Sequence, residues 1–587
     1  MSTEGLRISG RGSWRQAESG QASIGLLVIF ACLVLSGVAF AIDFANLWFH
    51  RQAAQSAADA ACQAGAMDLL ATSGGVQLKS MGFTPGTASN CASSSSATMC
   101  TYAGFNGYSG AGPQPASNTN SAWNTVSWTF PTSVPGTTAP PSSMTATPYM
   151  QVNVVENVKT FFIGMFTRSN YQQVGSSCTC GLAQIKEAAP MIVLNPTASG
   201  SFTESGGGNL LNIVGGPQRS VQVNSNSATA VSCSGSPVIN TSKGGPNATG
   251  SDIGVVGLQT QAQNGCGNNG GAMGFNGGST GAWRSGVLPV PDPYSAVGAP
   301  NSVKSITPVT YNAGANTYYT WVGENIDGCP ETQNSGTTGQ NCLEYGPGYY
   351  PSGINVATSN LTAIFLPGVY YLNGSLTLSG SATARVAMPC WASYSSGFSA
   401  SACSTVASAN HLVYTQGSGV MFYFLSGSFN VSGCSGCSNS NIENNLPSNV
   451  MTCDGSAPNA NLGMPASLTG NILWGQCTTN ATYYDAGGDT TDSAGNPGNR
   501  GILFFQDHGN TTQPTFSGSG SLSFAGSLYF HSTGYSDVLN LSGGSSSGTF
   551  IVGNIVTDKV NLSGSAQINL QLSPVPSTYV LKSTTFQ

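Results

Sequence analysis

An uncharged run from Ser19 to Ile42 constrains the fold of this chain more than any other feature. Its apolar part, Ile24–Ile42, has the length of about 20 residues that an α-helix needs to cross the hydrocarbon core of a bilayer. A cleaved signal peptide is the alternative, but its apolar region is normally shorter, at about 7–15 residues. The run therefore predicts one transmembrane helix, over residues 21–43.

The charges on either side of this run predict its orientation. Beyond it, Arg51 is the only basic residue before Lys79. Three basic residues precede the run: Arg7, Arg11 and Arg15. Since segments rich in Lys and Arg stay in the cytoplasm, we expect a cytoplasmic basic leader over residues 1–20 and export of everything after the span.

A helical stalk is predicted directly after the span, over residues 44–71. This segment has no proline and is rich in Ala, Gln and Leu, which favour helix. Trp48 lies just past the span, where aromatic side chains anchor at the membrane interface. Small residues let helices approach closely, so four positions are candidates for packing against another anchor helix: Gly25, Gly37, Ala57 and Ala61. Helix propensity alone explains the alanines equally well.

The span and the stalk together carry a family resemblance. Asp43 and the aromatic Phe44 follow the span directly, and after a polar turn the stalk reads QSAADAA from Gln55 to Ala61. This order resembles the N-terminus of TadG-like proteins (the TadE/TadG type) of the Flp, or tight adherence, pilus assembly system. The resemblance implies a single-pass protein of the bacterial inner membrane that works with other pilus-assembly proteins.

Residues 72–190 are predicted to form a small α+β domain outside the membrane, with a linker. They are rich in Ser, Thr, Gly and Pro, and Tyr149–Val155 alternates apolar and polar residues as a strand does. Phe161–Phe166 is a short apolar segment that fits one helix or turn. The order of strand, small helix and strand also resembles the membrane-proximal part of TadG-like proteins.

Composition limits what the exported part is. Charged residues make up only 6% of the 587 residues, and 77 residues are Gly. These values fit either a disordered chain or a β-rich repetitive fold, and a hydrophobic content of 40% favours the second. The net charge of −6 offers no basic patch, so we expect no nucleic-acid partner.

A short repeat predicts the fold of residues 191–587. Apolar residues flank Asn before Ser-Gly in Phe429–Gly433, Leu539–Gly543 and Val560–Gly564, and the last two copies begin 21 residues apart. Repeats of about 20 residues or more are typical of stacked coils. We therefore predict a mainly β protein with a large right-handed parallel β-helix, a solenoid in which inward Asn and Ser side chains form ladders. A β-sandwich or tandem immunoglobulin-like domains are the alternative.

Disulfides are expected in the exported part, because the chain has 16 cysteines and oxidising compartments favour local staples. Cys32 lies in the span and Cys62 on the stalk. The other cysteines are disulfide candidates and occur as sequence neighbours: Cys91 and Cys100, Cys178 and Cys180, Cys233 and Cys266, Cys329 and Cys342, Cys390 and Cys403, Cys434 and Cys437, Cys453 and Cys477. A Cys178–Cys180 bridge would be tight, so pairing of both with Cys91 and Cys100 is an alternative. Zinc is disfavoured, because a site needs four ligands and no His lies close to the two shortest spacings.

Some parallel β-helices cleave polysaccharides, with paired carboxylates acting as acid and base or nucleophile. The candidates here are Asp507 with His508, Asp537 near His531, and a loop with three acidic residues, Asp485, Asp489 and Asp492. Turn formation explains Asp507, and solvation explains the loop, which lacks the regular spacing of a Ca²⁺ site. We therefore predict no catalytic, cofactor-binding or metal-binding residues, and no cofactor.

Together these features predict a structural, non-enzymatic, membrane-anchored component of a Flp pilus assembly system. Its β-solenoid would lie in the periplasm or be exposed on the cell surface, and its partners would be the inner membrane and other pilus-assembly proteins. One alternative is a membrane-tethered adhesin or glycan-binding β-helix outside any pilus machine. The other is a polysaccharide lyase or hydrolase.

Overall fold

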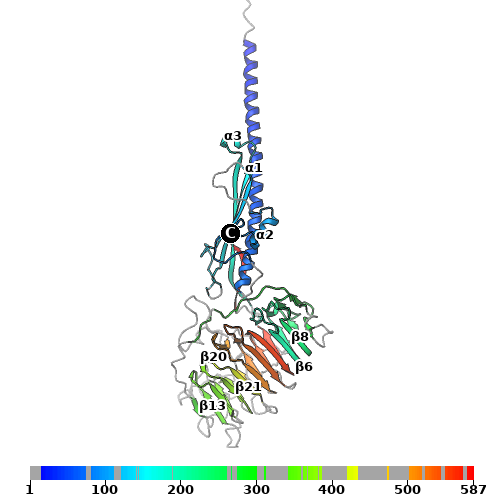
Figure 1. Cartoon of the computed structure of the whole chain (residues 1–587), viewed down its shortest axis with the longest axis vertical. Coiled ribbons are helices and arrows are strands. Elements are labelled where there is room, and N and C mark those ends of the chain that lie inside the picture. Colours follow the sequence, from blue (N-terminus) through cyan, green and yellow to red (C-terminus); the bar gives the residue numbers. More distant parts are fainter. Residues whose placement is uncertain are drawn as a thin grey trace, which may run out of the picture.

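A long helix, a small sheet beside it and a broad β-solenoid make up the computed structural model (Figure 1). The structure describes residues 15–586 apart from these segments: 74–80, 111–120, 141, 143–144, 188–189, 261–265, 267–273, 296, 301–309, 313–340, 358–360, 366–367, 381–382, 387–419, 434–471, 475–501, 519–521, 544–548 and 573–577.

α1 (Arg15–Ser73) is one continuous helix that carries both the predicted span and the predicted stalk. At 1.5 Å per residue, its 59 residues extend about 88 Å. The apolar part projects beyond the rest of the molecule (Figure 1). Its large side chains, such as Leu26 and Leu33, are exposed. Among the described residues it is the one helix that is long and apolar enough to cross a membrane.

Five antiparallel strands form the small sheet beside the stalk part of α1, in the order β1-β2-β3-β4-β32. Their bounds are β1 (Ser89–Asn90), β2 (Trp123–Thr129), β3 (Tyr149–Lys159), β4 (Tyr171–Glu187) and β32 (Thr578–Phe586). Two short helices accompany them, α2 (Thr98–Phe105) between β1 and β2, and α3 (Gly164–Thr167) at the tip of the β3–β4 hairpin.

Small side chains on one face of α1 let the helix lie close to this sheet. Gly65 marks a close approach, because a Cβ atom there would lie 2.0 Å from Cε of Met150. Trp128 and Val152 contribute larger side chains to the same core. Four alanines of α1 are fully buried in it: Ala54, Ala57, Ala58 and Ala61.

Ten strands of the C-terminal part form one parallel sheet, called here the ten-stranded sheet, in the order β11-β9-β7-β5-β29-β26-β23-β20-β17-β14. Their bounds are β5 (Met191–Val193), β7 (Arg219–Val223), β9 (Asp252–Val255), β11 (Trp283–Ser285), β14 (Gly348–Tyr350), β17 (Gly368–Asn373), β20 (Val420–Ser426), β23 (Ile502–Gln506), β26 (Ser527–Phe530) and β29 (Ile555–Thr557).

The other strands of this part form two ladders of parallel pairs. The first ladder contains β15 (Ile354–Val356), β18 (Leu376–Leu378), β21 (Phe429–Gly433), β24 (Thr515–Gly518), β27 (Val538–Gly543), β30 (Lys559–Gly564) and the first parts of β6 (Phe202–Gly215) and β8 (Val231–Gly244). The second contains β13 (Asn341–Tyr345), β16 (Leu361–Phe365), β19 (Thr383–Val386), β22 (Ile472–Trp474), β25 (Leu522–Ala525), β28 (Thr549–Val552), β31 (Gln567–Leu572), the later parts of β6 and β8, and β10 (Gly274–Asn276). β12 (Thr310–Asn312) adds to β13 in antiparallel orientation.

A coil supplies one strand to the ten-stranded sheet and one to each ladder, as β26, β27 and β28 do. The two repeat copies at Leu539 and Val560 lie directly opposite each other in this stack, in register through to Gly543 and Gly564. Parallel stacking of coils confirms the predicted mainly β fold with a solenoid. It also argues against the β-sandwich alternative, whose sheets are antiparallel.

The chain enters the solenoid in its middle rather than at one end. β5, which follows the small sheet in sequence, lies between β7 and β29. Coils from β5 to β11 build outward in one direction, whereas coils from β14 to β29 build from the opposite end back to β5. The first and last coils in sequence are therefore neighbours in space, with β31 paired to β6.

The connection between the two ends of the stack begins as a strap, residues 286–295 and 297–300, on the outer face of the ten-stranded sheet. Asn224 Nδ2 donates a hydrogen bond to the carbonyl of Val290 (2.7 Å), and Tyr294 joins an apolar cluster with Tyr423. The central strands β20 and β23 are therefore buried on both faces. Burial of both faces explains why β20 and β23 are continuous apolar runs and do not alternate.

The repeated Asn residues lie on the outside of the solenoid. In β27, Leu539 and Leu541 are buried while Asn540 is half-buried, and Asn561 Nδ2 donates to Asn540 Oδ1 at 3.1 Å. The prediction that Asn and Ser ladders point inward was therefore wrong. Apolar side chains fill the inward positions, and the amides pair on the outer face.

The prediction from the sequence also placed the last strand in the wrong part of the molecule. It assigned residues 578–586 to the solenoid, but β32 pairs with β4, from Thr578 opposite Glu187 to Phe586 opposite Thr179. Leu581 is buried in the core of the small domain (Figure 1, where the C-terminus lies next to α1). An edge strand and a solenoid strand have the same local pattern, so only the long-range pairing distinguishes them.

Candidate functional site

Asp43 fixes a hairpin tip to α1 at the point where the predicted span ends. Its buried carboxylate accepts hydrogen bonds from the backbone N–H groups of Phe161 (2.8 Å), Phe162 (2.6 Å) and Ile163 (2.6 Å). These residues lie between β3 and α3. Hydrogen bonds to an ionised carboxylate are roughly twice as strong as neutral ones, so this contact holds the tip firmly.

Further polar contacts continue along α1 away from the span. Asn46 Nδ2 donates to the carbonyl of Lys159 (3.1 Å), and His50 Nδ1 lies 3.0 Å from Glu156 Oε2. Tyr108 OH donates to the same Glu156 oxygen at 3.0 Å. Burial and this carboxylate raise the pKa of Tyr108, so the phenol remains a donor. We call this set the anchor junction: Asp43, Asn46, His50, Tyr108, Glu156 and the hairpin tip, residues 160–170.

A disulfide between Cys62 and Cys180 joins the stalk to β4. Cys62 was not among the predicted disulfide candidates. Cys180 was predicted to pair with Cys178 or with one of Cys91 and Cys100, and both predictions were wrong. Cys178 is buried as a free thiol, and burial together with the neighbouring Asp59 raises its pKa to about 12. Side chains two positions apart on a β-strand point to the same face of the sheet. Cys178 and Cys180 therefore both face α1, and only Cys180 meets Cys62.

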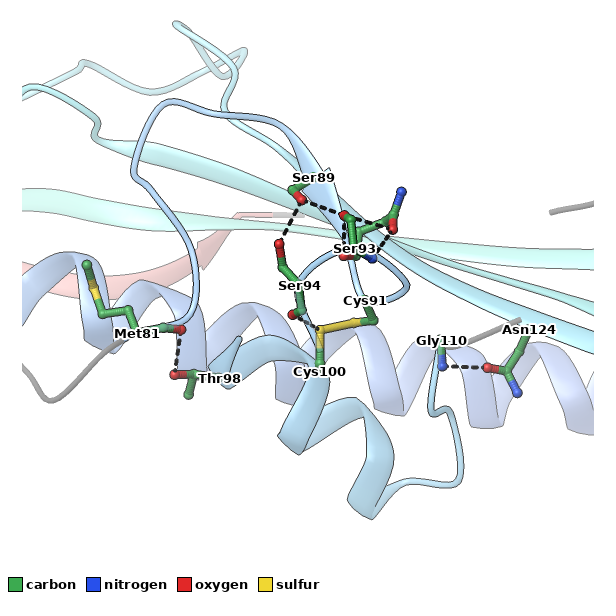
Figure 2. Close-up of a disulfide and its surroundings, with 10 residues drawn as sticks. Met81, Ser89, Cys91, Ser93, Ser94, Thr98, Cys100, Gly110 and Asn124 are labelled. Atoms are coloured by element: carbon green, nitrogen blue, oxygen red, sulfur yellow. Dashed lines mark hydrogen bonds between the residues drawn. A yellow bond between two sulfur atoms is a disulfide. The ribbon is translucent and has the colours of Figure 1, made fainter. Parts of the chain in front are cut away.

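Two of the neighbouring pairs are bonded in the structure. Cys91 is joined to Cys100, which links the end of β1 to α2 (Figure 2). In the same close-up, Gly110 N–H donates to Asn124 Oδ1 at 2.7 Å. Cys233 is joined to Cys266 in the solenoid. The remaining disulfide candidates have side chains outside the described residues: Cys329, Cys342, Cys390, Cys403, Cys434, Cys437, Cys453 and Cys477.

The four helix-packing candidates differ in what surrounds them. Ala57 and Ala61 are fully buried against the small sheet. The helix face that was predicted to pack on another helix is therefore covered by this sheet. A Cβ atom at Gly25 or at Gly37 would meet no atom within 4 Å. Packing of a second helix at these two glycines stays a prediction.

Four of the acidic and histidine candidates lie near one another at the ends of β23 and β26 and before β27: Asp507, His508, His531 and Asp537. Asp507 accepts a hydrogen bond from Tyr423 OH and one from its own turn, at Gly509 N–H (2.8 Å). His508 Nε2 lies 2.7 Å from Tyr529 OH, and Tyr529 OH donates to Asp292 Oδ2 of the strap (2.6 Å). The hydrogen bond from Gly509 N–H, two residues later, is the kind expected of an Asp in a turn.

The second half of this cluster surrounds Asp558. His531 Nδ1 lies 2.5 Å from Asp558 Oδ1, and Ser532 and Asp537 donate backbone N–H groups to Asp558 Oδ2, each at 3.1 Å. Burial and the nearby charge of Asp558 raise the pKa of Asp537 to about 7. Burial lowers the pKa of His531, but its hydrogen bond to Asp558 and the surrounding carboxylates outweigh this and raise it.

Protein groups donate hydrogen bonds to Asp537 and Asp558, while Asp537 Oδ1 is buried without a hydrogen-bond partner among the described residues. Gln506 Nε2 donates to Asp537 Oδ2 at 2.8 Å, so the two carboxylates Asp537 and Asp558 are each engaged by protein donors. Within the described residues, no group of three or more His, Cys, Asp or Glu side chains is arranged to hold a metal ion. The acidic loop with Asp485, Asp489 and Asp492 lies outside the described residues.

Sequence reasoning missed several residues that build these sites. Asp43 was noted only as part of a family pattern, and no local signal links it to a turn 118 residues later. Asp292 and Asp558 were not singled out, because each joins the cluster through a long-range contact.

Comparison with known families finds a match to the N-terminal part of the chain. Residues 20–68 match the family described as putative Flp pilus-assembly TadE/G-like. The match begins just before the apolar span and ends within the part of α1 that packs on the small sheet. No curated protein and no solved structure matches the chain.

Proposed function

We propose that this chain is a single-pass inner-membrane component of a Flp pilus assembly system, with its N-terminus in the cytoplasm and its solenoid in the periplasm. The observation that carries the proposal is the family match over residues 20–68. These residues lie on α1, which contains the predicted span and also packs into the core of the small domain. The three disulfides among the described residues support an oxidising compartment for the exported part.

The way the solenoid is joined to the anchor supports a structural role. β4 is tied to α1 by the Cys62–Cys180 disulfide and leads into the solenoid, and β32 returns from the solenoid to pair along β4. With β4 fixed to α1 and β32 paired along β4, two chain connections to the solenoid would restrict its motion relative to the stalk. The chain would therefore act as a non-enzymatic strut that holds the solenoid at a set orientation above the membrane.

Capture of neighbours in native membranes tests the proposal. A photoreactive residue at Phe105, which is exposed on α2, would be activated in cells and its adducts identified by mass spectrometry. Adducts with pilus-assembly proteins support the proposal, provided that the same residue at Leu258 on the solenoid does not capture the same membrane-proximal set. Adducts with unrelated envelope proteins alone, from both positions, would contradict it.

A glycan-binding adhesin is a second candidate, and the outer face of the first ladder favours it. Asn540, Asn561 and Thr203 are in register there, and so are Ser542, Ser563 and Ser205. These rows give uncharged hydrogen-bonding groups at the strand spacing of about 4.8 Å. Binding of the purified chain to a glycan array, abolished by Asn540→Ala with Asn561→Ala, would support this function over the first.

A further inference from the structure

We propose that the hairpin tip and the aromatic residues at the start of the stalk form a collar that inserts into the interfacial layer of the bilayer, on the side of the exported domain. The inference rests on the proposed function only in requiring that α1 spans the membrane. The collar consists of six apolar side chains: Phe44, Trp48, Phe49, Phe161, Phe162 and Met165.

The height of these residues along α1 places them at the lipid headgroups. Ile24–Ile42 extends about 28 Å at 1.5 Å per residue, which fills a hydrocarbon core of about 30 Å. Asp43 is the next residue, and its carboxylate lies within 2.8 Å of the backbone nitrogens of Phe161 and Phe162. Trp48 is about 8 Å further along the helix axis. Each polar layer of a bilayer is about 5–8 Å thick, so Phe44 and the tip residues beside Asp43 fall within it, and Trp48 and Phe49 lie at its outer edge.

The collar exposes large apolar side chains, which is unfavourable on a surface that faces water. Met165 is 80% exposed and Phe161 62%, although both sit on a hairpin whose backbone is fixed. On α1, Phe44 is 62% exposed and Phe49 66%. Contiguous apolar patches of this kind mark contact surfaces, and aromatic side chains are enriched at membrane interfaces. Continuity with the exposed apolar surface of the span identifies lipid as the occupant.

The collar surrounds α1 on more than one side. Asp43, Asn46 and His50 face the hairpin, as their hydrogen bonds show. Phe44 and Trp48 are four residues apart and so share a different face of the helix. The tip therefore adds membrane contact on the side of α1 that its own aromatic residues leave open.

The charges at the rim of the collar also suit a bilayer surface. Lys159 and Arg168 are exposed at the two ends of the tip, and Arg51 is exposed on α1. The acidic groups at this level are engaged: Asp43 by three backbone donors and Glu156 by His50 and Tyr108. A basic rim around an apolar tip attracts anionic headgroups while the apolar side chains insert.

Photocrosslinking of the full chain in bilayers tests this inference. The chain would carry p-benzoylphenylalanine at Met165, in vesicles of phosphatidylethanolamine and phosphatidylglycerol, and lipid adducts would be measured by mass spectrometry. Leu33 in the span is the positive control. Leu258 on the solenoid is the matched negative control, because it is 82% exposed and Met165 is 80% exposed. We expect lipid adducts at Met165 at least tenfold above those at Leu258.

The outcomes separate this inference from the proposed function. Adducts at Leu33 without adducts at Met165 would overturn the collar and leave the anchor in place. Protein adducts at Met165 between copies of the chain would also overturn it, since the tip would then be a protein interface. Absence of lipid adducts at Leu33 would instead remove the membrane anchor itself, and the collar with it.

A substitution at Asp43 tests how the tip is held. Asp43→Asn should speed hydrogen exchange of the amides of Phe161, Phe162 and Ile163 at least tenfold and lower lipid adducts at Met165, with Leu33 unchanged. Asp59→Asn, on an exposed carboxylate further along α1, is the control and should change neither. Unchanged exchange and unchanged adducts in Asp43→Asn would show that the carboxylate does not position the tip.

Discussion

The sulfur of Cys62 on α1 is bonded to that of Cys180 on β4, 118 residues later in the chain. The bond joins the helix that carries the predicted span to the strand that leads into the solenoid. It lies in the core that the alanine face of α1 forms with the small sheet. Both strands that connect to the solenoid in sequence, β4 and β32, belong to the sheet of this core.

Removal of this disulfide should destabilise the small domain strongly. The chain-entropy relation gives about 5 kcal/mol for a loop of this length and about 3 kcal/mol for the short loop closed by Cys91 and Cys100. Chemical denaturation of Cys62→Ala with Cys180→Ala in detergent should therefore show the larger loss, with Cys91→Ala and Cys100→Ala as the comparison. A larger loss from the short loop would contradict this account of the junction.

The returning strand β32 should contribute to the same core. Leu581 is buried there, so Leu581→Ala should cost about 2–4 kcal/mol in the free energy of unfolding. Lys582 is exposed on the same strand, and Lys582→Ala should change stability by no more than about 0.5 kcal/mol. Equal effects in thermal unfolding would mean that β32 is only loosely attached to β4.

Glu204 should make the solenoid less stable as the pH rises. Its carboxyl is buried, neither oxygen has a hydrogen-bond partner, and burial raises its pKa to about 8 from an ordinary value of 4.5. The folded state then binds a proton that the unfolded state has lost, so stability falls by about 1.4 kcal/mol per pH unit between these two values.

The matched variants for this test are Glu204→Gln and Glu204→Leu. Leu562 occupies the facing position on β30, so Leu continues the apolar ladder at residue 204. Both variants should unfold at a higher temperature than the wild type at pH 8, with a difference that shrinks toward pH 4. A wild-type unfolding temperature independent of pH, equal to that of the variants, would show that the carboxyl is not buried.

His531 should give the same direction of pH dependence in the wild type, but its replacement should destabilise the solenoid. Its folded pKa is raised, so its pairing with Asp558 stabilises the solenoid below the unfolded pKa of about 6.5 and is lost as the pH rises through the folded value. His531→Gln should therefore lose stability at pH 5.5 and approach the wild type at pH 9. Hydrogen exchange in residues 531–537 measures this locally, and a constant difference across this range would argue against a charged pair.

Gly37 should matter for association and not for folding. No atom lies within 4 Å of a Cβ built there, so Gly37→Leu should unfold at the wild-type temperature. If another anchor helix packs at this glycine, the variant should lose co-purifying membrane proteins. Ala57→Leu is the contrasting change, because Ala57 is buried and its replacement should lower stability. Retention of every partner by Gly37→Leu would remove Gly37 as a packing site.

The parts of the fold that the sequence predicted are those with local patterns. The apolar run and the proline-free stalk became the continuous helix α1, and the repeat at Leu539 and Val560 became opposed rungs of a solenoid. The central position of β5 had no such pattern, because which coils are neighbours depends on contacts hundreds of residues apart.

The candidate sites show the same division. Cys91 and Cys100 are nine residues apart and their bond is a local event, whereas the Cys62–Cys180 bond requires α1 to lie on β4. The role of Asp43 likewise depends on a distant hairpin.

Imaging of surface pili tests the central claim most directly. The gene would be deleted in the bacterium that carries it, and pili would be counted by electron microscopy before and after complementation with the wild-type chain. The account predicts that pili are lost or shortened in the deletion strain and return on complementation. Normal pili together with reduced adherence would contradict it, and would assign the function to the solenoid as an adhesin.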